Sequence, residues 1–261
     1  MLKKKLVFYL YYADSKNSEE FYNFHFSCLK KYCHIFDEAV FVISVDDVSD
    51  YHLIREAEDK ILDIFKGTSV SFDIHKNDKM HEVYAFEKYV INTKDKDGLV
   101  FFGHSKGFSN IKKFDKEYIY KWIAGMYYFN LNFMDEVENL LLETKSISYG
   151  SFLMHDELNE TNKYRWFYIG TFFWINLGKL ENYIRQNNIE LPLICDRAYA
   201  EEFLGNIYPF EQLPYAASHL NRALINARDF YHYINEYISM MYYEDELKEF
   251  YEFFDAIKNE E

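Results

Sequence analysis

The residues with the clearest chemical potential lie in one short stretch, residues 98–107. Here an apolar run leads into a turn that carries an imidazole, a hydroxyl and an ammonium group, on His104, Ser105 and Lys106. Glycines flank the three side chains, the second being Gly107, and glycine permits positive φ angles and a close approach of the backbone to a ligand. Buried strands of α/β folds bind ligands at their carboxyl ends. The stretch therefore predicts an anion-binding site, in which His104 and Lys106 face a group such as a nucleotide diphosphate.

The same turn also matches the Gly-x-Ser-x-Gly pattern of a hydrolase nucleophile elbow, with Ser105 as the nucleophile. A hydrolase needs an acid and then a histidine later in the chain, and Asp196 and His219 stand in that order. Lys106 directly after the serine is a poor neighbour for an oxyanion hole, and only short strands precede the turn. A serine hydrolase is therefore the weaker alternative. The Gly-x-Gly-x-x-Gly and Walker patterns are absent from the sequence, which argues against a dinucleotide oxidoreductase or a P-loop enzyme.

The elements before this turn alternate between strand and helix. Apolar runs predict strands at 6–12, 38–45, 69–74 and 99–102, and helical spacing predicts helices from residue 18, at 51–65 and at 81–91. Such alternation is typical of a parallel sheet with right-handed crossovers. The turn at 103–107 would then follow the fourth strand.

The rest of the chain has a different pattern. Helices are expected at 116–133, 135–144, 178–186 and 196–203, the last ended by Gly205. One or two more helices are expected at 229–258. A strand is expected at 146–154, and the densest aromatic segment is 166–175. The fold class is predicted as α/β, a mostly parallel sheet flanked by helices with a helical C-terminal appendage. We expect one domain at 1–225 and a helical extension at 226–261 packed on it.

Composition narrows the classes of function. The chain has 261 residues, a net charge of −14 and a 20% aromatic share. The negative charge argues against nucleic acid as a partner. No apolar run approaches the ~20 residues of a transmembrane helix, and three cysteines without metal-ligand spacing indicate a reduced, cytoplasmic protein.

Three segments in order resemble motifs of GT-A-type sugar-nucleotide glycosyltransferases of bacterial and viral polysaccharide synthesis. Residues 102–107 look like their His-x-Lys-Gly motif, and residues 166–174 look like their Ser-Gly-Thr-Phe-Phe-Trp segment, with Ile169 where serine is common. Residues 196–205 resemble their Asp-Arg…Ala-Glu…Gly element. Together the motifs span about half of the chain, and each alone is weak. The resemblance implies a GT-A-like, Rossmann-like fold.

The resemblance also implies a binding site for a nucleotide-sugar donor at the carboxyl ends of the first strands. The donor-binding residues would be Tyr11, Tyr12, Asp46, His104, Ser105, Lys106, Gly107 and Arg197. Many GT-A enzymes carry an Asp-x-Asp metal motif where this chain has His104 and Lys106. A lysine can neutralise a departing diphosphate without a metal, whereas His104 or Asp46 could also hold a divalent cation, Mn²⁺ or Mg²⁺.

If the transfer inverts the anomeric configuration, which the sequence leaves open, it further requires a carboxylate that accepts the proton of the acceptor hydroxyl. Asp196 is the first candidate for this base and Glu201 the second, although Asp196 is equally well explained as a helix N-cap. The resemblance places Gly170 and Thr171 close to the sugar and Trp174 against an acceptor ring. A plain core strand is the alternative for this aromatic run.

These observations predict a cytoplasmic glycosyltransferase that transfers a sugar to a glycan or to a lipid-linked acceptor, the latter at the inner face of the membrane. One alternative is a GT-A-like protein that binds carbohydrate or a partner without turnover, because the Asp-x-Asp motif is missing. The other is the serine hydrolase. The oligomeric state, the sugar and the acceptor are open.

Overall fold

The computed structural model describes residues 2–13, 16–78, 80–105, 115–156, 165–168, 170–191, 199–207, 216–217, 238–239 and 244–259. Four predicted site residues, Lys106, Gly107, Asp196 and Arg197, lie outside these ranges. The expected domain boundary at 225/226 lies outside them as well.

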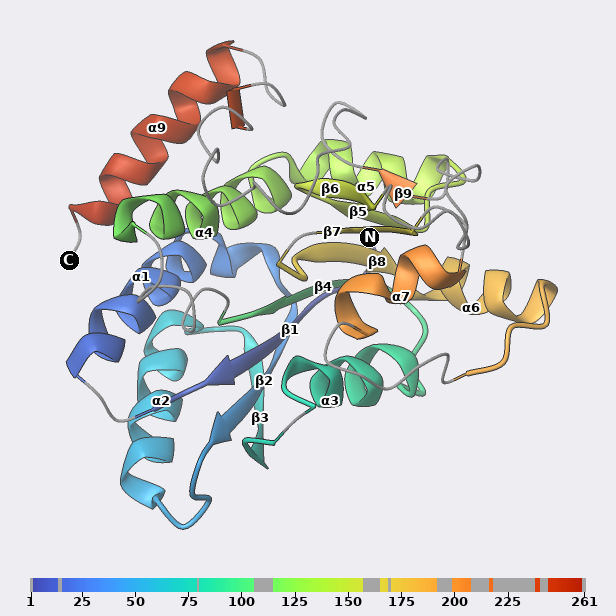
Figure 1. Ribbon diagram of the computed structural model, residues 1–261. Helices are drawn as coiled ribbons and strands as arrows, with labels where there is room; N and C mark the ends of the chain where they lie inside the picture. The colour runs from blue at the N-terminus through green and yellow to red at the C-terminus, as the bar shows by residue number, and fades with distance from the viewer. Residues whose placement is uncertain are drawn as a thin grey trace.

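The first four strands form the parallel half of the sheet. They are β1 (Lys4–Tyr11), β2 (Glu38–Val45), β3 (Ser69–Lys76) and β4 (Leu99–His104), in the spatial order β3-β2-β1-β4. Helices α1 (Lys16–Tyr32), α2 (Tyr51–Ile64) and α3 (Glu82–Phe86) connect them, with a 3-10 turn η1 (Cys33–Ile35) after α1 and a π-helical turn η2 (Glu87–Ile91) after α3 (Figure 1). The predicted parallel α/β arrangement of this half is confirmed.

Beyond β4 the sheet continues with short strands. β8 (Phe173–Asn176) pairs antiparallel with β4, and β5 (Ser148–Gly150) and β9 (Ala216–Ala217) follow, so that seven strands of the described chain form one sheet. A separate hairpin pairs β6 (Leu153–Asp156) with β7 (Arg165–Tyr168). The single strand expected at 146–154 is therefore two strands, and the aromatic segment 166–175 contributes to two strands around a turn.

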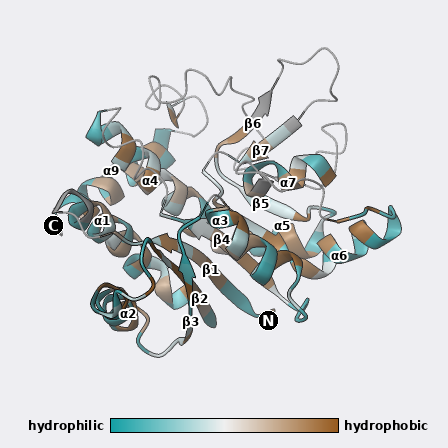
Figure 2. Ribbon diagram, turned by 60° about the horizontal axis from the view of Figure 1, so that its bottom comes forward, coloured by the Kyte–Doolittle hydropathy of each residue, from teal (hydrophilic) through white to brown (hydrophobic). Residues whose placement is uncertain are grey.

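Helices cover both faces of the sheet. α1, α2, α4 (Lys116–Leu131), α5 (Met134–Glu143) and α9 (Glu244–Lys258) share one hydrophobic core with one face, and α3, α6 (Leu177–Gln186) and α7 (Tyr199–Ile207) share a second core with the other face (Figure 1). Side chains alternate between the two cores along β1, as the period of a strand requires. In Figure 2, hydrophilic residues colour much of α2 and α6, while hydrophobic residues run through the central strands. The predicted C-terminal helix is present as α9, and no described helix is long and apolar enough to cross a membrane.

Polar side chains set where several helices begin. Asp50 accepts a hydrogen bond from the Leu53 amide at the start of α2, and Asp115 accepts one from the Glu117 amide at the start of α4. Asn176 does the same for the Lys179 amide of α6. Each satisfies an amide group that has no partner within its own helix.

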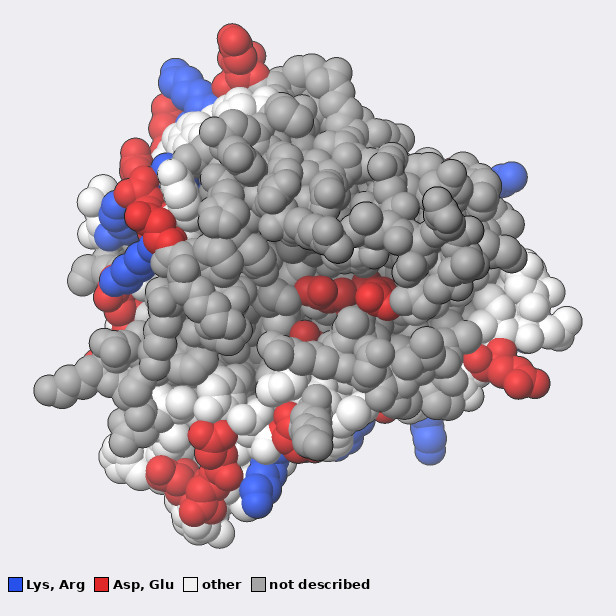
Figure 3. Space-filling view, in the orientation of Figure 1, with Lys and Arg blue, Asp and Glu red and all other residues white. Residues whose placement is uncertain are grey.

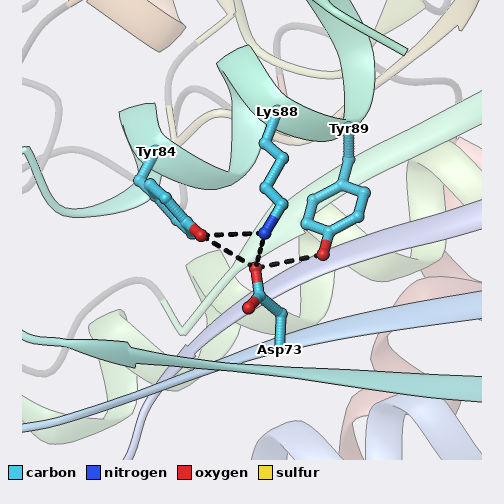
Figure 4. A network of polar contacts seen from close by, with 4 residues as sticks. All are labelled: Asp73, Tyr84, Lys88 and Tyr89. Carbon is cyan, nitrogen blue, oxygen red and sulfur yellow. Dashed lines mark hydrogen bonds and ion pairs between the residues drawn. The ribbon is translucent and has the colours of Figure 1, made fainter. Parts of the chain in front are cut away.

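Helix α3 and the turn η2 are attached to the edge strand β3 through one carboxylate. Asp73 accepts hydrogen bonds from the Tyr84 hydroxyl (3.1 Å), Lys88 Nζ (2.9 Å) and the Tyr89 hydroxyl (3.0 Å) (Figure 4). Hydrogen bonds to the Tyr84 hydroxyl and to the Asp73 carboxylate raise the pKa of Lys88 above its ordinary value. This network fixes the start of α3 above the sheet, and that start carries Glu82.

Helix α7 corrects one sequence-based expectation. Gly205 was expected to end this helix, but α7 continues to Ile207. A Cβ atom on Gly205 would lie 1.8 Å from the carbonyl oxygen of Trp166. The glycine therefore allows α7 to pack directly on β7, and it does not act as a helix stop.

Candidate functional site

The candidate site lies between β1 and β4, where successive strands stop being added on one side of β1 and continue on its other side. β2 and β3 follow on one side of β1 and β4 lies on its other side, so the carboxyl ends of β1 and β4 form the switch point at which open α/β sheets bind ligands. Tyr9 is paired with His104 across these two strands, and Tyr11 is paired with Ser44 on β2. These positions continue the face that packs against α3 and α7.

One side of the site is built around Asp46, directly after β2. Its Oδ2 accepts a hydrogen bond from the Tyr11 hydroxyl (2.9 Å), and its Oδ1 accepts one from Asn77 Nδ2 (2.9 Å). Burial raises the pKa of Tyr11 to about 12, with the hydrogen bond to Asp46 as the next cause. The carboxylate is exposed, so a ligand can reach it. The structure therefore brings the predicted pair Tyr11 and Asp46 together.

Ser105 extends the pairing of β1 with β4. Its Oγ accepts a hydrogen bond from the Tyr11 amide (3.0 Å), and its own amide donates to the Tyr9 carbonyl (2.9 Å). The side chain is buried. The ring of the neighbouring His104 is directed to the carbonyl of Gly170. Within the described ranges, then, Ser105 has a backbone-holding role, and it is not hydrogen-bonded to a histidine as a nucleophile would be.

His104 connects β4 to the turn between β7 and β8. Its Nε2 lies 2.9 Å from the Gly170 carbonyl oxygen, which can only accept, so Nε2 donates. Its Nδ1 lies 3.9 Å from Oε1 of Glu82, and both side chains are 8% exposed. The amide of Gly170 donates to Oε1 of Glu201 (3.2 Å), in the first turn of α7. The predicted residues His104, Gly170 and Glu201 therefore form one cluster, together with Glu82.

The turn that His104 holds has an unusual backbone. Gly170 and Thr171 have φ angles of +87° and +58°. A Cβ on Gly170 would lie 2.3 Å from Sδ of Met126, so glycine is required there. A β-branched residue with positive φ is strained, and such strain is found at functional sites. Thr171 is also fully buried, and its hydroxyl has no hydrogen-bond partner among the residues that the structure describes.

Two predicted residues are placed away from this cluster. Tyr12 points to the opposite face of the sheet, where its hydroxyl donates to Oε1 of Glu56 (2.8 Å) and accepts from Lys60 Nζ (3.2 Å). Trp174 is fully buried beside Phe36 and Phe101, with its indole N–H donated to the Asn130 carbonyl. The expectation that Trp174 stacks on an acceptor ring is wrong, because core side chains cover the indole ring of Trp174.

Sequence reasoning did not single out several residues of the site. Tyr9 and Ser44 are buried hydroxyl groups beside each other, without a hydrogen bond of standard geometry between them. Burial raises the pKa of the Tyr9 phenol, and the charge of Glu82 adds to the shift. Tyr9 and Ser44 have the strand parity of Tyr11 and Asp46, which is the signal that could have identified them. Asn77 comes directly after β3, as Asp46 does after β2, and that position is its signal; Glu82 follows a turn and carries none.

Acidic side chains lie among the described residues at the centre of this face, which carries α7 (Figure 3). The first turn of α7 contains Glu201 and Glu202. Among the described residues, no group of three or more His, Cys, Asp or Glu side chains is arranged to hold a metal ion.

The sequence was also compared with known proteins. No protein-family model matches the chain, and no curated protein matches it. The interpretation of the site therefore depends on its geometry and chemistry.

Proposed function

We propose that the protein is a glycosyltransferase that moves a sugar from a nucleotide-sugar donor to a glycan or to a lipid-linked acceptor. The observation that supports this most is the strained turn Gly170–Thr171, held between His104 and Glu201 at the switch point of a mostly parallel sheet. Polar groups converge here at strand ends, which is where open α/β sheets bind nucleotides and similar ligands.

The nucleoside part of the donor would lie beside Asp46. Its exposed carboxylate, already oriented by Tyr11 and Asn77, can accept hydrogen bonds from ribose hydroxyls. Lys106 and Arg197, which lie outside the described residues, are the cations proposed for the diphosphate. Because His104 already donates to Gly170, its proposed role changes from phosphate contact to support of the turn.

Glu201 is the proposed base among the described residues, and Asp196 remains a prediction outside them. In the transfer step the acceptor oxygen attacks the anomeric carbon and its proton passes to the carboxylate. The bond between that carbon and the diphosphate oxygen breaks, and the electron pair leaves with the nucleotide. A positioned base contributes about 10²–10⁴-fold to such a rate.

Among the described residues, Asp46 and His104 are not part of a group of three or more side chains that could hold a cation, and His104 is directed to Gly170 and Glu82. No step is therefore assigned to a divalent cation, and Mn²⁺ enters only as a condition of the binding test.

Calorimetric titration of the purified full chain with UDP, GDP, ADP and CDP, with and without Mn²⁺, tests the proposal. We expect one diphosphate to bind, and Tyr11→Phe to weaken it about tenfold by releasing Asp46, since a hydrogen bond to a charged group contributes about 1.5–3 kcal/mol. Tyr12→Phe is the matched control, since that ring faces the other side of the sheet, and its affinity should stay unchanged.

Binding of none of these nucleotides would rule out the transferase and leave a carbohydrate- or partner-binding protein. Hydrolysis of simple esters by the wild type that is lost in Ser105→Ala would favour the serine hydrolase instead.

A further inference from the structure

Both backbone polar groups of Gly170, its carbonyl and its amide, are hydrogen-bonded to side chains. His104 donates to its carbonyl at 2.9 Å, and its amide donates to the Glu201 carboxylate at 3.2 Å. The residue has a φ of +87° and is followed by the strained Thr171. Strained backbone persists only where its surroundings determine it strongly. These two contacts are therefore the ones that fix this turn relative to β4 and α7.

Glu82 lies behind the imidazole. Its Oε1 is 3.9 Å from Nδ1 of His104, and the carboxylate is as deeply buried as the ring. The imidazole therefore lies between the Gly170 carbonyl at Nε2 and the Glu82 carboxyl group on the side of Nδ1. Glu82 itself is held at the start of α3, which the Asp73 network attaches to β3, and the residue before it, His81, has a strained φ of +45°. Glu82 is therefore a buried carboxyl group whose position next to His104 is fixed by the elements around it.

We propose that Glu82 and His104 are positioning residues, which hold the Gly170–Thr171 turn and, through the Gly170 amide, the Glu201 carboxylate. The assignment of Glu201 as the base rests on the proposed function, whereas the coupling between these groups does not. Small misplacements of a reacting group can reduce a rate about 100-fold, so residues that touch neither the donor nor the acceptor can control turnover.

The coupling is tested without any substrate by a double-mutant cycle in urea unfolding. Glu82→Gln and Glu201→Gln are compared singly and together, with Glu138→Gln as the matched control; Glu138 is a part-buried carboxylate paired with Lys4 at the opposite end of β1. Members of one network are energetically coupled, whereas distant sites are additive. We expect the unfolding constants of Glu82→Gln and Glu201→Gln to depart from multiplicativity about threefold or more, and those of Glu138→Gln and Glu201→Gln to multiply within about twofold.

The positioning role is tested by turnover of the donor that the titrations identify. His104→Leu removes the donor to Gly170, while His104→Gln keeps an N–H group able to reach that carbonyl. We expect kcat to fall about 100-fold in His104→Leu with KM for the donor unchanged, and His104→Gln to recover at least about tenfold of that loss. A side chain that only fills space would not distinguish leucine from glutamine in this way.

Multiplicative effects of Glu82→Gln and Glu201→Gln would overturn the proposal. A rise in KM with unchanged kcat in His104→Leu would also overturn it, because the pair would then serve donor binding. If the wild type binds none of the nucleotides, the proposed function fails, and the unfolding cycle still decides the coupling by itself.

Discussion

The buried hydroxyl of Thr171 allows a quantitative test of the strained turn. Thr171→Val replaces this hydroxyl with a methyl group and keeps the β-branched shape, so the cost of the φ angle of +58° stays the same. A buried polar group without a partner costs about 1–3 kcal/mol of folding free energy. The side chain is 0% exposed and its Oγ1 has no hydrogen-bond partner among the described residues. We therefore expect Thr171→Val to increase the free energy of unfolding by about 1 kcal/mol.

Thr144→Val is the matched control, because it makes the same chemical change where the hydroxyl is bonded. Thr144 Oγ1 donates to the Leu140 carbonyl (2.6 Å) and accepts from the Ser146 amide (3.0 Å). Its loss should lower the free energy of unfolding by about 1 kcal/mol. Urea denaturation at one pH would measure both variants, and thermal melting should move by about 2–4 °C in opposite directions.

The same variant separates stability from function. Because Thr171 is fully buried, a sugar could reach its hydroxyl only if the turn opens on binding. In that case Thr171→Val should slow transfer about tenfold while the protein becomes more stable, the trade-off expected of a functional site. A loss of stability in Thr171→Val as large as that in Thr144→Val would refute the reasoning, because it would show that the hydroxyl is already hydrogen-bonded in the free protein.

Three further outcomes are expected. Gly205→Ala places a Cβ where the Trp166 carbonyl oxygen lies 1.8 Å away, so it should cost about 3 kcal/mol in urea denaturation and displace α7. Asp73→Asn should lower stability by about 1–2 kcal/mol, because it removes the charged acceptor shared by three donors. Burial raises the pKa of Tyr11 to about 12 and also raises those of Tyr9 and Tyr149. Phenols of the unfolded chain ionise near pH 10, so the contribution of these tyrosines to stability should be complete below about pH 10 and be lost above it. Urea midpoints measured between about pH 8 and pH 12 with tyrosine absorbance would show the fall.

The sequence was sufficient to predict the parallel half of the fold. Residues 38–45 form a continuous apolar run followed by acids, and such runs separated by helical spacing leave few arrangements other than parallel strands. Helix ends were harder. In the sequence, Gly205 is typical of a residue that ends a helix. The structure shows another reason for the glycine, because the Trp166 carbonyl oxygen on β7 leaves no room for a side chain at this position of α7.

The site could be predicted only in part. The family resemblance implies Tyr11 and Asp46 as donor-binding residues at the carboxyl ends of the first strands, and the structure places the two in hydrogen-bond contact. Glu82 was missed because an acid in the first turn of a helix is usually solvated, and its burial depends on β4 and α3 meeting in space. The resemblance also implies Tyr12 and Trp174 as site residues, but a family motif does not show which face of a strand a side chain takes. The alternation of strand faces directs Tyr12 into the opposite core, and contact with Phe36 and Phe101 buries Trp174.

Release of nucleoside diphosphate from sugar nucleotides tests the central proposal most directly. The purified chain would be incubated with a panel of hexose donors carrying each nucleobase, with and without Mn²⁺, and the released diphosphate measured over hours. We expect slow release from one donor, reduced about 100-fold or more in Glu201→Gln at unchanged fold. Release from no donor by a folded wild-type protein that also binds no nucleotide would contradict the account, and equal release by Glu201→Gln would contradict the assignment of Glu201 as the base.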